Sequence, residues 1–195
     1  MVKKHLADTE ASRKEYLALP DSEWRKDYFD ETTGGFVATH ILKEKDNYRR
    51  PGIVAEVNAC YDLARIGKQV LRLPENIPNL IDTILIGGKP YRELLKFKTS
   101  EKDPRGYPDA YFDGQTWDFK TSSFEKIDTT RQLIKNARKA DNVVFVISQD
   151  HHLETIGIAI DREFGNRLLK GGWEELPDVY CLRNNQLSTI WVKKK

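Results

Sequence analysis

Two aspartates that a predicted β-hairpin would bring face to face are the clearest candidates for chemistry in this sequence. Residues 110–120 form two short strand-like runs around Asp113-Gly114, and an Asp-Gly pair is a strong signal for a two-residue hairpin turn. With that turn, Asp109 pairs with Asp118 across the two strands. Directly opposed carboxylates repel each other, so the pair predicts a bound cation or a compensating basic group between them.

Lys120 is expected beside the two aspartates. Side chains alternate along a strand, so Asp118 and Lys120 share one face. Carboxylate oxygens bind hard divalent cations such as Mg²⁺ or Mn²⁺, and such an ion lowers the pKa of a bound water and holds a phosphate. A neighbouring lysine can position that water or offset charge at the phosphate. The plain alternative is a solvent-exposed hairpin with a salt bridge.

A third acid, Glu56, falls on the apolar side of a predicted helix. On a helical wheel for residues 53–66 it lies within the arc that contains Val57 and Leu63. An unpaired carboxylate there is costly to desolvate, so it should meet a metal ion, a basic partner or a cleft open to water. The alternative is an acid at the rim of the stripe whose carboxylate reaches solvent. Read together with the two aspartates, Glu56 is expected to join a shared site.

A basic stripe is predicted on the helix after the hairpin, where Arg131, Lys135 and Arg138 recur with helical spacing. Such a stripe usually solvates a helix, but directly after an acidic strand it could bind phosphate oxygens. Gln132, on the same helix, is a candidate polar contact to a substrate. His40, at the end of a predicted strand, is a secondary candidate, because a lone histidine is more often structural than catalytic.

The elements that must position these residues alternate between helices and strands. The N-terminal elements expected are two short helices separated at Pro20, a strand over 36–42 and a helix over 51–66 closed by Gly67. The later elements expected are a strand over 69–73, a strand or helical turn over 80–86, the hairpin, a helix over 124–140, a central strand over 143–147, strands over 155–160, 179–182 and 186–192, and a helix over 161–169.

This order favours an α/β protein with a mixed β-sheet flanked by helices, divided into a helical N-terminal arm over residues 1–32 and a main domain over 33–195. The chain of 195 residues is 39% hydrophobic, which is enough for a core and excludes wholesale disorder. No apolar run approaches the roughly 20 residues needed to span a bilayer, and the first residues lack the apolar stretch of a signal peptide. A net charge of +2 permits a nucleic-acid partner without requiring one.

The order of these motifs resembles the PD-(D/E)xK nuclease superfamily. The matching residues, within 52–147, are Glu56 on a helix, then Pro108-Asp109, then Asp118-Phe119-Lys120, followed by a helix and a hydrophobic strand. This resemblance implies a restriction-endonuclease-like core. In that core Asp109 and Asp118 are metal ligands, Glu56 is an additional acid near the metal, and Lys120 is the catalytic lysine.

A second resemblance bears on the substrate. The segments 33–40 and 56–67 look like parts of the C-terminal nuclease domains of contact-dependent growth inhibition toxins, including tRNA-cleaving ones, and of related domains in mobile elements. The resemblance implies a toxin that acts in the cytoplasm, without membrane insertion, and a cognate immunity protein. Residues 78–107 depart from a minimal version of the nuclease pattern, which bears on specificity more than on catalysis.

The function expected is therefore a Mg²⁺- or Mn²⁺-dependent endonuclease that hydrolyses phosphodiester bonds with an activated water. RNA, and tRNA in particular, is favoured over DNA on the resemblance alone. A DNA endonuclease of restriction or repair type would use the same site. A catalytically silent domain that binds nucleic acid or protein is the alternative from another class, and a metal-free ribonuclease using His40 is the competing chemistry.

Overall fold

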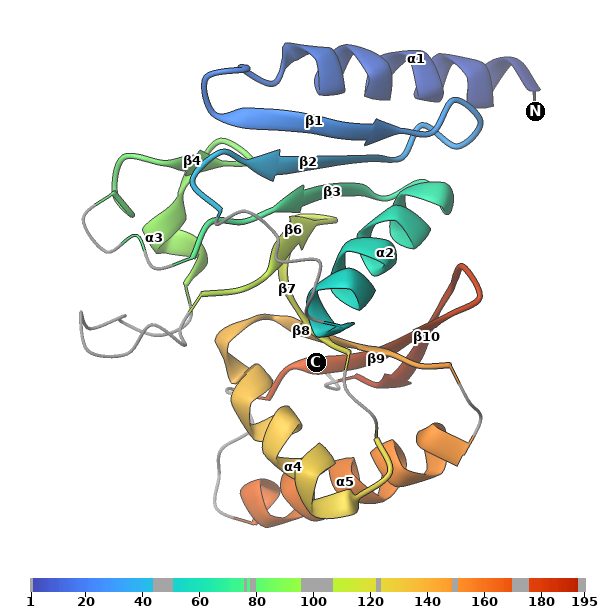
Figure 1. Cartoon of the computed structure of the whole chain (residues 1–195), viewed down its shortest axis with the longest axis vertical. Coiled ribbons are helices and arrows are strands. Elements are labelled where there is room, and N and C mark those ends of the chain that lie inside the picture. The colour runs from blue at the N-terminus through green and yellow to red at the C-terminus, as the bar shows by residue number, and fades with distance from the viewer. Residues whose placement is uncertain are drawn as a thin grey trace.

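An eight-stranded mixed β-sheet runs through the molecule in the order β1-β2-β3-β6-β7-β8-β9-β10 (Figure 1). The computed structural model describes residues 2–43, 51–75, 77, 80–95, 107–121, 124–148, 151–169 and 176–192. The expected α/β class, with a mixed sheet flanked by helices, is confirmed at this level.

The sheet mixes parallel and antiparallel pairs, and its two central pairs, β3–β6 and β6–β7, are antiparallel. Its strands are β1 (Trp24–Phe29), β2 (Phe36–His40), β3 (Gln69–Arg72), β6 (Ala110–Phe112), β7 (Gln115–Lys120), β8 (Asn142–Val146), β9 (Asp178–Arg183) and β10 (Gln186–Trp191). The pairs β2–β3, β7–β8 and β8–β9 are parallel, whereas the other neighbouring pairs are antiparallel. A separate two-stranded sheet pairs β4 (Leu85–Ile86) with β5 (Lys89–Pro90).

Helices cover both faces of the large sheet. They are α1 (Val2–Ala18), α2 (Pro51–Arg65), the short α3 (Tyr91–Leu94), α4 (Ile127–Asn136) with the 3₁₀ turn η2 (Ala137–Lys139), and α5 (His151–Leu168). Helix α2 packs on one face, where Cys60 and Val144 share a hydrophobic cluster. Helices α4 and α5 pack on the other face, where Val143 and Cys181 share another. Val143 and Val144 are consecutive residues of β8, so the two clusters lie on opposite sides of the sheet.

The hairpin predicted from Asp113-Gly114 is confirmed, and its register is the expected one for the three pairs from Phe112–Gln115 to Ala110–Trp117. Tyr111 pairs with Thr116, and the turn residues both have positive φ, at 53° for Asp113 and 75° for Gly114. Two consecutive residues with positive φ make a type I′ turn, whose twist matches that of the flanking strands. The turn therefore sets which residues of β6 and β7 lie opposite each other.

The close approach of β2 to α2 depends on a glycine. A Cβ atom built at Gly35, directly before β2, would lie 1.9 Å from the backbone carbonyl oxygen of Ala64 near the end of α2. The predicted closing residue, Gly67, has φ of +87° just beyond that helix. The predicted strand over 36–42 and helix over 51–66 are confirmed within two residues at each end.

Two predicted elements are wrong. The second N-terminal helix is replaced by β1, an edge strand whose Trp24 is buried and whose Asp27 accepts a 2.5 Å hydrogen bond from the Thr39 hydroxyl of β2. Pairing with β2 overrides the local helical signal there. The strand over 155–160 is instead part of α5, whose Ile156, Ile160 and Phe164 recur every four residues on the buried side.

Residues 80–86, expected as a strand or helical turn, form turns that lead into β4, and the helix over 161–169 is the second half of α5. The helix over 124–140 is α4 followed by η2, and the strands over 69–73, 143–147, 179–182 and 186–192 are β3, β8, β9 and β10. None of the described helices combines the length and apolar character needed to traverse a bilayer.

Candidate functional site

Asp109 and Asp118 meet at the open end of the β6–β7 hairpin. The Asp109 amide donates to the Trp117 carbonyl at 2.9 Å. Trp117 is the strand partner of Ala110, so the regular register ends there and does not include the expected pairing of Asp109 with Asp118. One carboxylate oxygen of Asp109, Oδ2, accepts the Phe119 N–H at 2.7 Å. Both acids are buried, with side-chain exposures of 11% for Asp109 and 1% for Asp118. The structure thus brings the two predicted acids together in a site largely shielded from water.

Two lysines balance the charge of this pair. The Lys139 ammonium lies 3.1 Å from Asp109 Oδ1 and 3.0 Å from Asp118 Oδ1. Lys120, predicted to share the face of Asp118, lies 2.5 Å from Asp118 Oδ2. These distances are those of ion pairs, but the angles at Asp118 do not satisfy hydrogen-bond geometry, and both of its buried oxygens are without a hydrogen bond. Lys139 donates a hydrogen bond to Asp109, whereas Coulombic attraction carries the contacts of the two lysines with Asp118.

The two acids have opposite pKa shifts. Burial and the charge of Asp109 raise the pKa of Asp118 to about 6. Burial also opposes ionisation of Asp109, but Lys139, Lys120 and Lys43 outweigh it and hold the pKa of Asp109 below its usual range. The Lys139 ammonium loses solvation on burial, yet the two aspartates hold its pKa above its usual value. Asp109 is therefore the acid whose charged form the fold favours.

Glu56, whose side chain is 19% exposed, meets basic partners. Its carboxylate lies 3.2 Å from Arg72 Nη2 and 3.6 Å from Lys43 Nζ, and Lys43 also lies 2.8 Å from Glu75. Burial and the charge of Asp109 raise the pKa of Glu56, while Lys43 and Arg72 act in the opposite direction. Of the three environments considered for this acid, the structure supplies the basic partner, close enough to Asp109 for the two charges to interact.

Helix α2 and strand β7 are joined where they carry the site. The Thr121 hydroxyl, just beyond β7, donates to the Gly52 carbonyl in the first turn of α2 at 3.0 Å. This bond fixes the start of the helix against the strand that carries Asp118 and Lys120. Glu56 follows Gly52 by one helical turn and is thereby held on the side of the hairpin.

The metal-ligand prediction rests on two aspartates rather than on three acids. Within the part of the chain that the structure describes, no group of three or more His, Cys, Asp or Glu side chains is arranged to hold a metal ion. Asp109 and Asp118 fit Mg²⁺ nonetheless, because this ion is usually bound by one or two carboxylates together with waters and substrate phosphates. The two buried Asp118 oxygens accept no hydrogen bond, although Lys120 and Lys139 each lie at ion-pair distance from one of them.

His40 lies apart from this cluster in a structural environment. It is 3% exposed, its Nδ1 accepts the Leu42 N–H at 3.2 Å, and its ring packs edge-on against Trp24. Burial lowers the pKa of His40, and the acid that opposes this effect is Glu23. The recorded contacts of His40 therefore do not include the aspartates.

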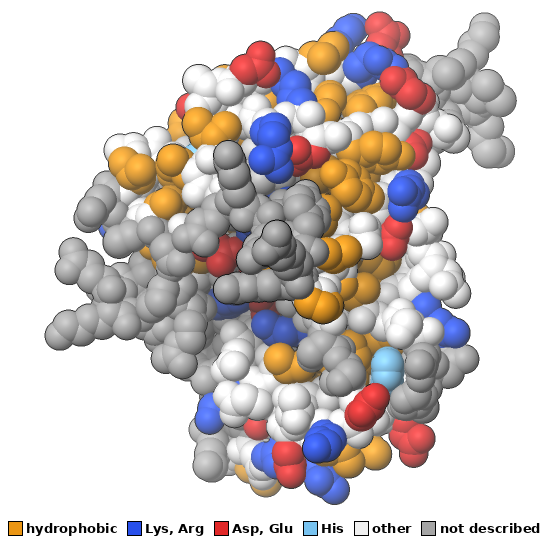
Figure 2. All heavy atoms as spheres, viewed as in Figure 1, with side chains coloured by type: hydrophobic (Ala, Val, Ile, Leu, Met, Phe, Trp, Pro, Cys, Tyr) orange, Lys and Arg blue, Asp and Glu red, His pale blue; other side chains and the backbone are white. Residues whose placement is uncertain are grey.

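The basic stripe on α4 is partly engaged with acids. Arg131 lies 3.4 Å from Asp128 and 3.9 Å from Glu163 of α5. Lys135 is exposed, and the exposed Gln132 donates to Asn136 at 3.0 Å. The side chain of Arg138 lies outside the described part of the chain. On the face in Figure 2, basic and acidic side chains are interspersed rather than gathered into a field of one sign.

Sequence reasoning missed three basic members of the cluster, namely Lys43, Arg72 and Lys139. Lys139 directly follows Arg138 of the predicted basic stripe, and its position in the sequence does not distinguish it as a partner of the aspartates. The 3₁₀ turn η2 changes the angle per residue and points Lys139 at the aspartates. The two fully buried alanines that flank the turn, Ala137 and Ala140, were the signal that this segment packs closely.

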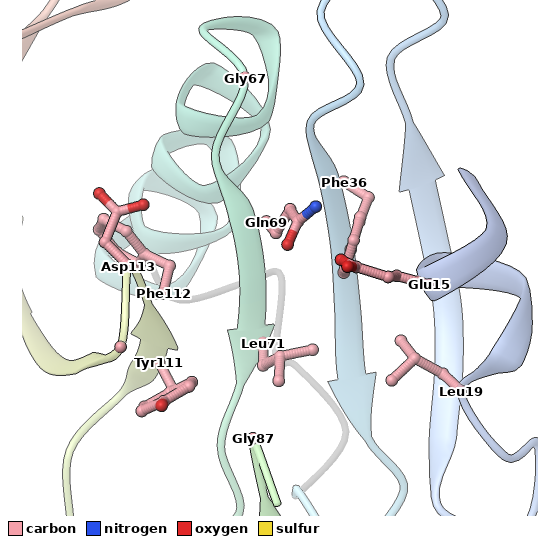
Figure 3. A pocket seen from close by; sticks show the side chains of 11 residues that line it. Glu15, Leu19, Phe36, Gly67, Gln69, Leu71, Gly87, Tyr111, Phe112 and Asp113 are labelled. Atoms are coloured by element: carbon pink, nitrogen blue, oxygen red, sulfur yellow. The ribbon is translucent and has the colours of Figure 1, made fainter. Parts of the chain in front are cut away.

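A cavity of about 380 Å³ lies elsewhere, between α1, β2, β3 and the hairpin (Figure 3). Phe36, Gln69, Leu71 and Tyr111 contribute to its wall. None of the candidate acids or lysines lines it. The candidate site is accordingly the buried ionic cluster rather than this cavity.

Comparisons with known proteins add no assignment: no family model matches the chain, and neither curated proteins nor solved structures give a significant match.

Proposed function

We propose that this protein is a divalent-metal-dependent nuclease that hydrolyses phosphodiester bonds in nucleic acid. The observation that carries the proposal is the buried pair Asp109 and Asp118, with Lys120 2.5 Å from one of its oxygens. Two buried carboxylates are costly to keep together without a function that uses them. The restriction-endonuclease-like arrangement belongs to the same proposal, with the resemblance of the Glu56, Asp109 and Asp118-Phe119-Lys120 motifs as its support.

The residues of the site have separable roles under this proposal. Asp109 and Asp118 would hold Mg²⁺ or Mn²⁺, which when bound supplies a water of lowered pKa and a Lewis acid for the phosphate. Lys120 orients the attacking water or offsets the charge that develops on the phosphate. Glu56, held by Arg72 of β3 and by Lys43, ties α2 to the sheet and adds an acid near the site.

The finer assignments rest on resemblance. We propose RNA, with tRNA as the first candidate, as the substrate, and a toxin activity in the cytoplasm that requires an immunity protein. The exposed Lys135, with Arg138 and Gln132, would contact substrate phosphates along α4. A DNA endonuclease would use the same acids, so the choice between RNA and DNA is left to experiment.

One observation favours a non-enzymatic alternative. Lys120 and Lys139 already neutralise the aspartate pair, so the cluster is electrostatically balanced without a metal. A silent nucleic-acid-binding domain could keep these residues as a buried ionic network. The two proposals can be distinguished because only a nuclease would cleave nucleic acid and lose that activity when Asp118 is replaced.

The test is cleavage of tRNA, other RNA and plasmid DNA by the purified protein, with Mg²⁺, with Mn²⁺ and with excess EDTA. Cleavage should require the metal, and Asp118→Asn should reduce it by about 10²-fold or more. Asp113→Asn is the matched control, because it makes the same change on the same hairpin at a turn position that suits Asn. This control should retain activity.

Each contrary result points to one alternative. Full activity in EDTA would favour metal-free chemistry based on His40. No cleavage of any substrate with either metal would favour the silent domain. Cleavage of plasmid DNA alone would keep the metal site and replace the RNA assignment.

A further inference from the structure

The oxygens that a bridging cation would share are already held by a lysine. Asp109 Oδ2 accepts the Phe119 N–H at 2.7 Å, and Asp118 Oδ2 lies 2.5 Å from Lys120. The other oxygen of each acid, Oδ1, lies 3.1 Å and 3.0 Å from the Lys139 ammonium. Lys139 therefore sits at the position from which one cation reaches both carboxylates.

The backbone of Lys139 is fixed, whereas its charge is carried on a long stem. Lys139 ends the 3₁₀ turn η2, and its neighbours Ala137 and Ala140 are fully buried. The Ala140 amide donates to the Ala137 carbonyl at 3.2 Å. A lysine has four rotatable carbons and a compact ammonium, so the charge can leave the aspartates while the turn stays in place.

The charges of the cluster make such a departure necessary for metal binding. Asp109 and Asp118 carry two negative charges when ionised, and Lys120 and Lys139 carry two positive ones. A divalent cation added to this neutral group would meet the ammonium of Lys139 at close range, where like charges repel strongly in a buried site. Displacement of Lys139 removes that repulsion.

We propose that Lys139 is a built-in competitor for the divalent cation, which keeps the site weakly metal-binding until an anionic phosphodiester enters and gives the displaced ammonium a new partner. The inference rests on the proposed function, because it takes Asp109 and Asp118 as the metal ligands. It adds a regulatory role for Lys139, which is not one of the residues that match the nuclease motifs. Metal and substrate should accordingly bind with positive coupling.

The first test is titration of the metal-free protein with Mn²⁺, followed by calorimetry. Lys139→Met keeps an unbranched side chain of similar length and removes the charge. It should bind Mn²⁺ about tenfold more tightly or better than the unsubstituted protein. Lys126→Met, which removes an exposed positive charge just before α4, is the control and should leave the affinity within about twofold.

The second test needs no variant and therefore stands if Lys139→Met fails to fold. Reductive methylation followed by mass spectrometry measures how readily each lysine amine reacts. Lys139, with 17% of its side chain exposed and two carboxylates at ion-pair distance, should react slowly in the metal-free protein. Saturating Mn²⁺ should make it react several times faster, whereas the exposed Lys126 should be unaffected.

Defined results would overturn the inference. Equal or weaker Mn²⁺ binding by Lys139→Met would show that Lys139 is a structural counter-ion that does not compete. The same conclusion would follow if Mn²⁺ bound without changing the reactivity of Lys139, and absence of Mn²⁺ binding would remove the metal site altogether. A protein that binds Mn²⁺ with release of Lys139 but cleaves no nucleic acid would uphold this inference and defeat the proposed nuclease function.

Discussion

Asp109 and Asp118 are neighbours on one hairpin, yet the fold treats their charges differently. Asp109 accepts a backbone N–H and has three lysines around it, so its ionised form is favoured. Asp118 is the more deeply buried of the two, and its ionised form is disfavoured by burial and by Asp109. Opposed charges alone would make the two acids equivalent. In the folded protein, ionisation is favourable for Asp109 and unfavourable for Asp118, relative to an exposed aspartate.

Substitution of the two acids should therefore separate activity from stability. Asp109→Asn should lower the free energy of unfolding by about 3 kcal/mol, because it removes one partner from a buried ionic network. Asp118→Asn should change it by less than about 1 kcal/mol, since the lost charge was disfavoured. Both should abolish cleavage. Chemical denaturation in EDTA measures the two stabilities, and equal losses would show that the acids are equivalent structural partners.

The raised pKa of Asp118 predicts a pH dependence of defined sign. The unfolded chain ionises this residue near pH 3.9, whereas the folded chain ionises it near pH 6. Between these values the folded state binds more protons, so the unfolding free energy should fall as the pH rises. The stability of the unsubstituted protein relative to Asp118→Asn should decrease by about 1–3 kcal/mol from pH 4 to pH 6.5.

Denaturation curves in EDTA at several pH values measure this difference. Asp109 contributes little to it, because a lowered pKa places its titration below the window. Glu56 also has a raised pKa, but it is present in both proteins. Parallel pH profiles for the two proteins would contradict the environment assigned to Asp118.

At the scale of elements, the contact between α2 and β2 depends on the absence of a side chain at Gly35. Gly35→Ala would place its Cβ 1.9 Å from the Ala64 carbonyl oxygen, and a backbone atom cannot yield as a side chain can. We expect a loss of about 3 kcal/mol or more in unfolding free energy. Activity should fall as well, because the same helix carries Glu56.

Gly157→Ala is the matched control for that substitution. Gly157 lies inside α5, and no atom lies within 4 Å of a Cβ built there. Alanine favours the helix, so this change should stabilise the protein by up to about 1 kcal/mol. Thermal melting of the two variants measures the contrast. A neutral Gly35→Ala would mean that the helix is not packed as closely as described.

The elements that sequence reasoning predicted are those specified locally. The hairpin follows from Asp113-Gly114 and α2 from its apolar periodicity with Gly67 at its end. The two wrongly predicted elements are segments whose secondary structure is determined by tertiary packing. The stretch containing Trp24 and Asp27 became a strand because β2 was there to pair with it, and the β-rich run at 155–160 became part of a helix whose buried positions recur at helical spacing.

The candidate site divides in the same way. Asp109, Asp118 and Lys120 lie within twelve residues of chain, so their arrangement followed from one turn and from strand alternation. The basic partners in the cluster come from elsewhere: Lys139, from the turn after α4, contacts the two aspartates, and Arg72, from β3, contacts Glu56. Such contacts depend on the register of the whole sheet, which no short segment determines.

At the scale of the whole molecule, β1 belongs to the sheet although it falls within the expected N-terminal arm. It pairs along β2, all five residues of which are buried. A fragment of residues 33–195 would leave the buried β2 as a bare edge and should aggregate. A fragment of residues 20–195 retains β1 and should stay folded, although it loses the packing of Tyr16 on Phe29 and Phe36.

Size-exclusion chromatography and thermal melting of the two fragments test this expectation. The longer fragment should elute as a defined species with a lowered melting temperature. The shorter one should elute as an aggregate or show no cooperative transition. A stable, monomeric 33–195 fragment would instead support the boundary expected from the sequence.

Each face of the large sheet carries one free cysteine, whose alkylation rate can report local opening of that face. Cys60 lies under α2 and Cys181 lies on the side of α4 and α5, and both are buried. Burial raises the pKa of the Cys60 thiol to about 12 and also raises that of Cys181. Cys60 is fully buried and cannot be alkylated until its layer opens, whereas Cys181 is 7% exposed and lines a cavity of about 530 Å³. Under native conditions Cys60 should therefore be labelled more slowly, at a rate that reports local opening of the α2 layer.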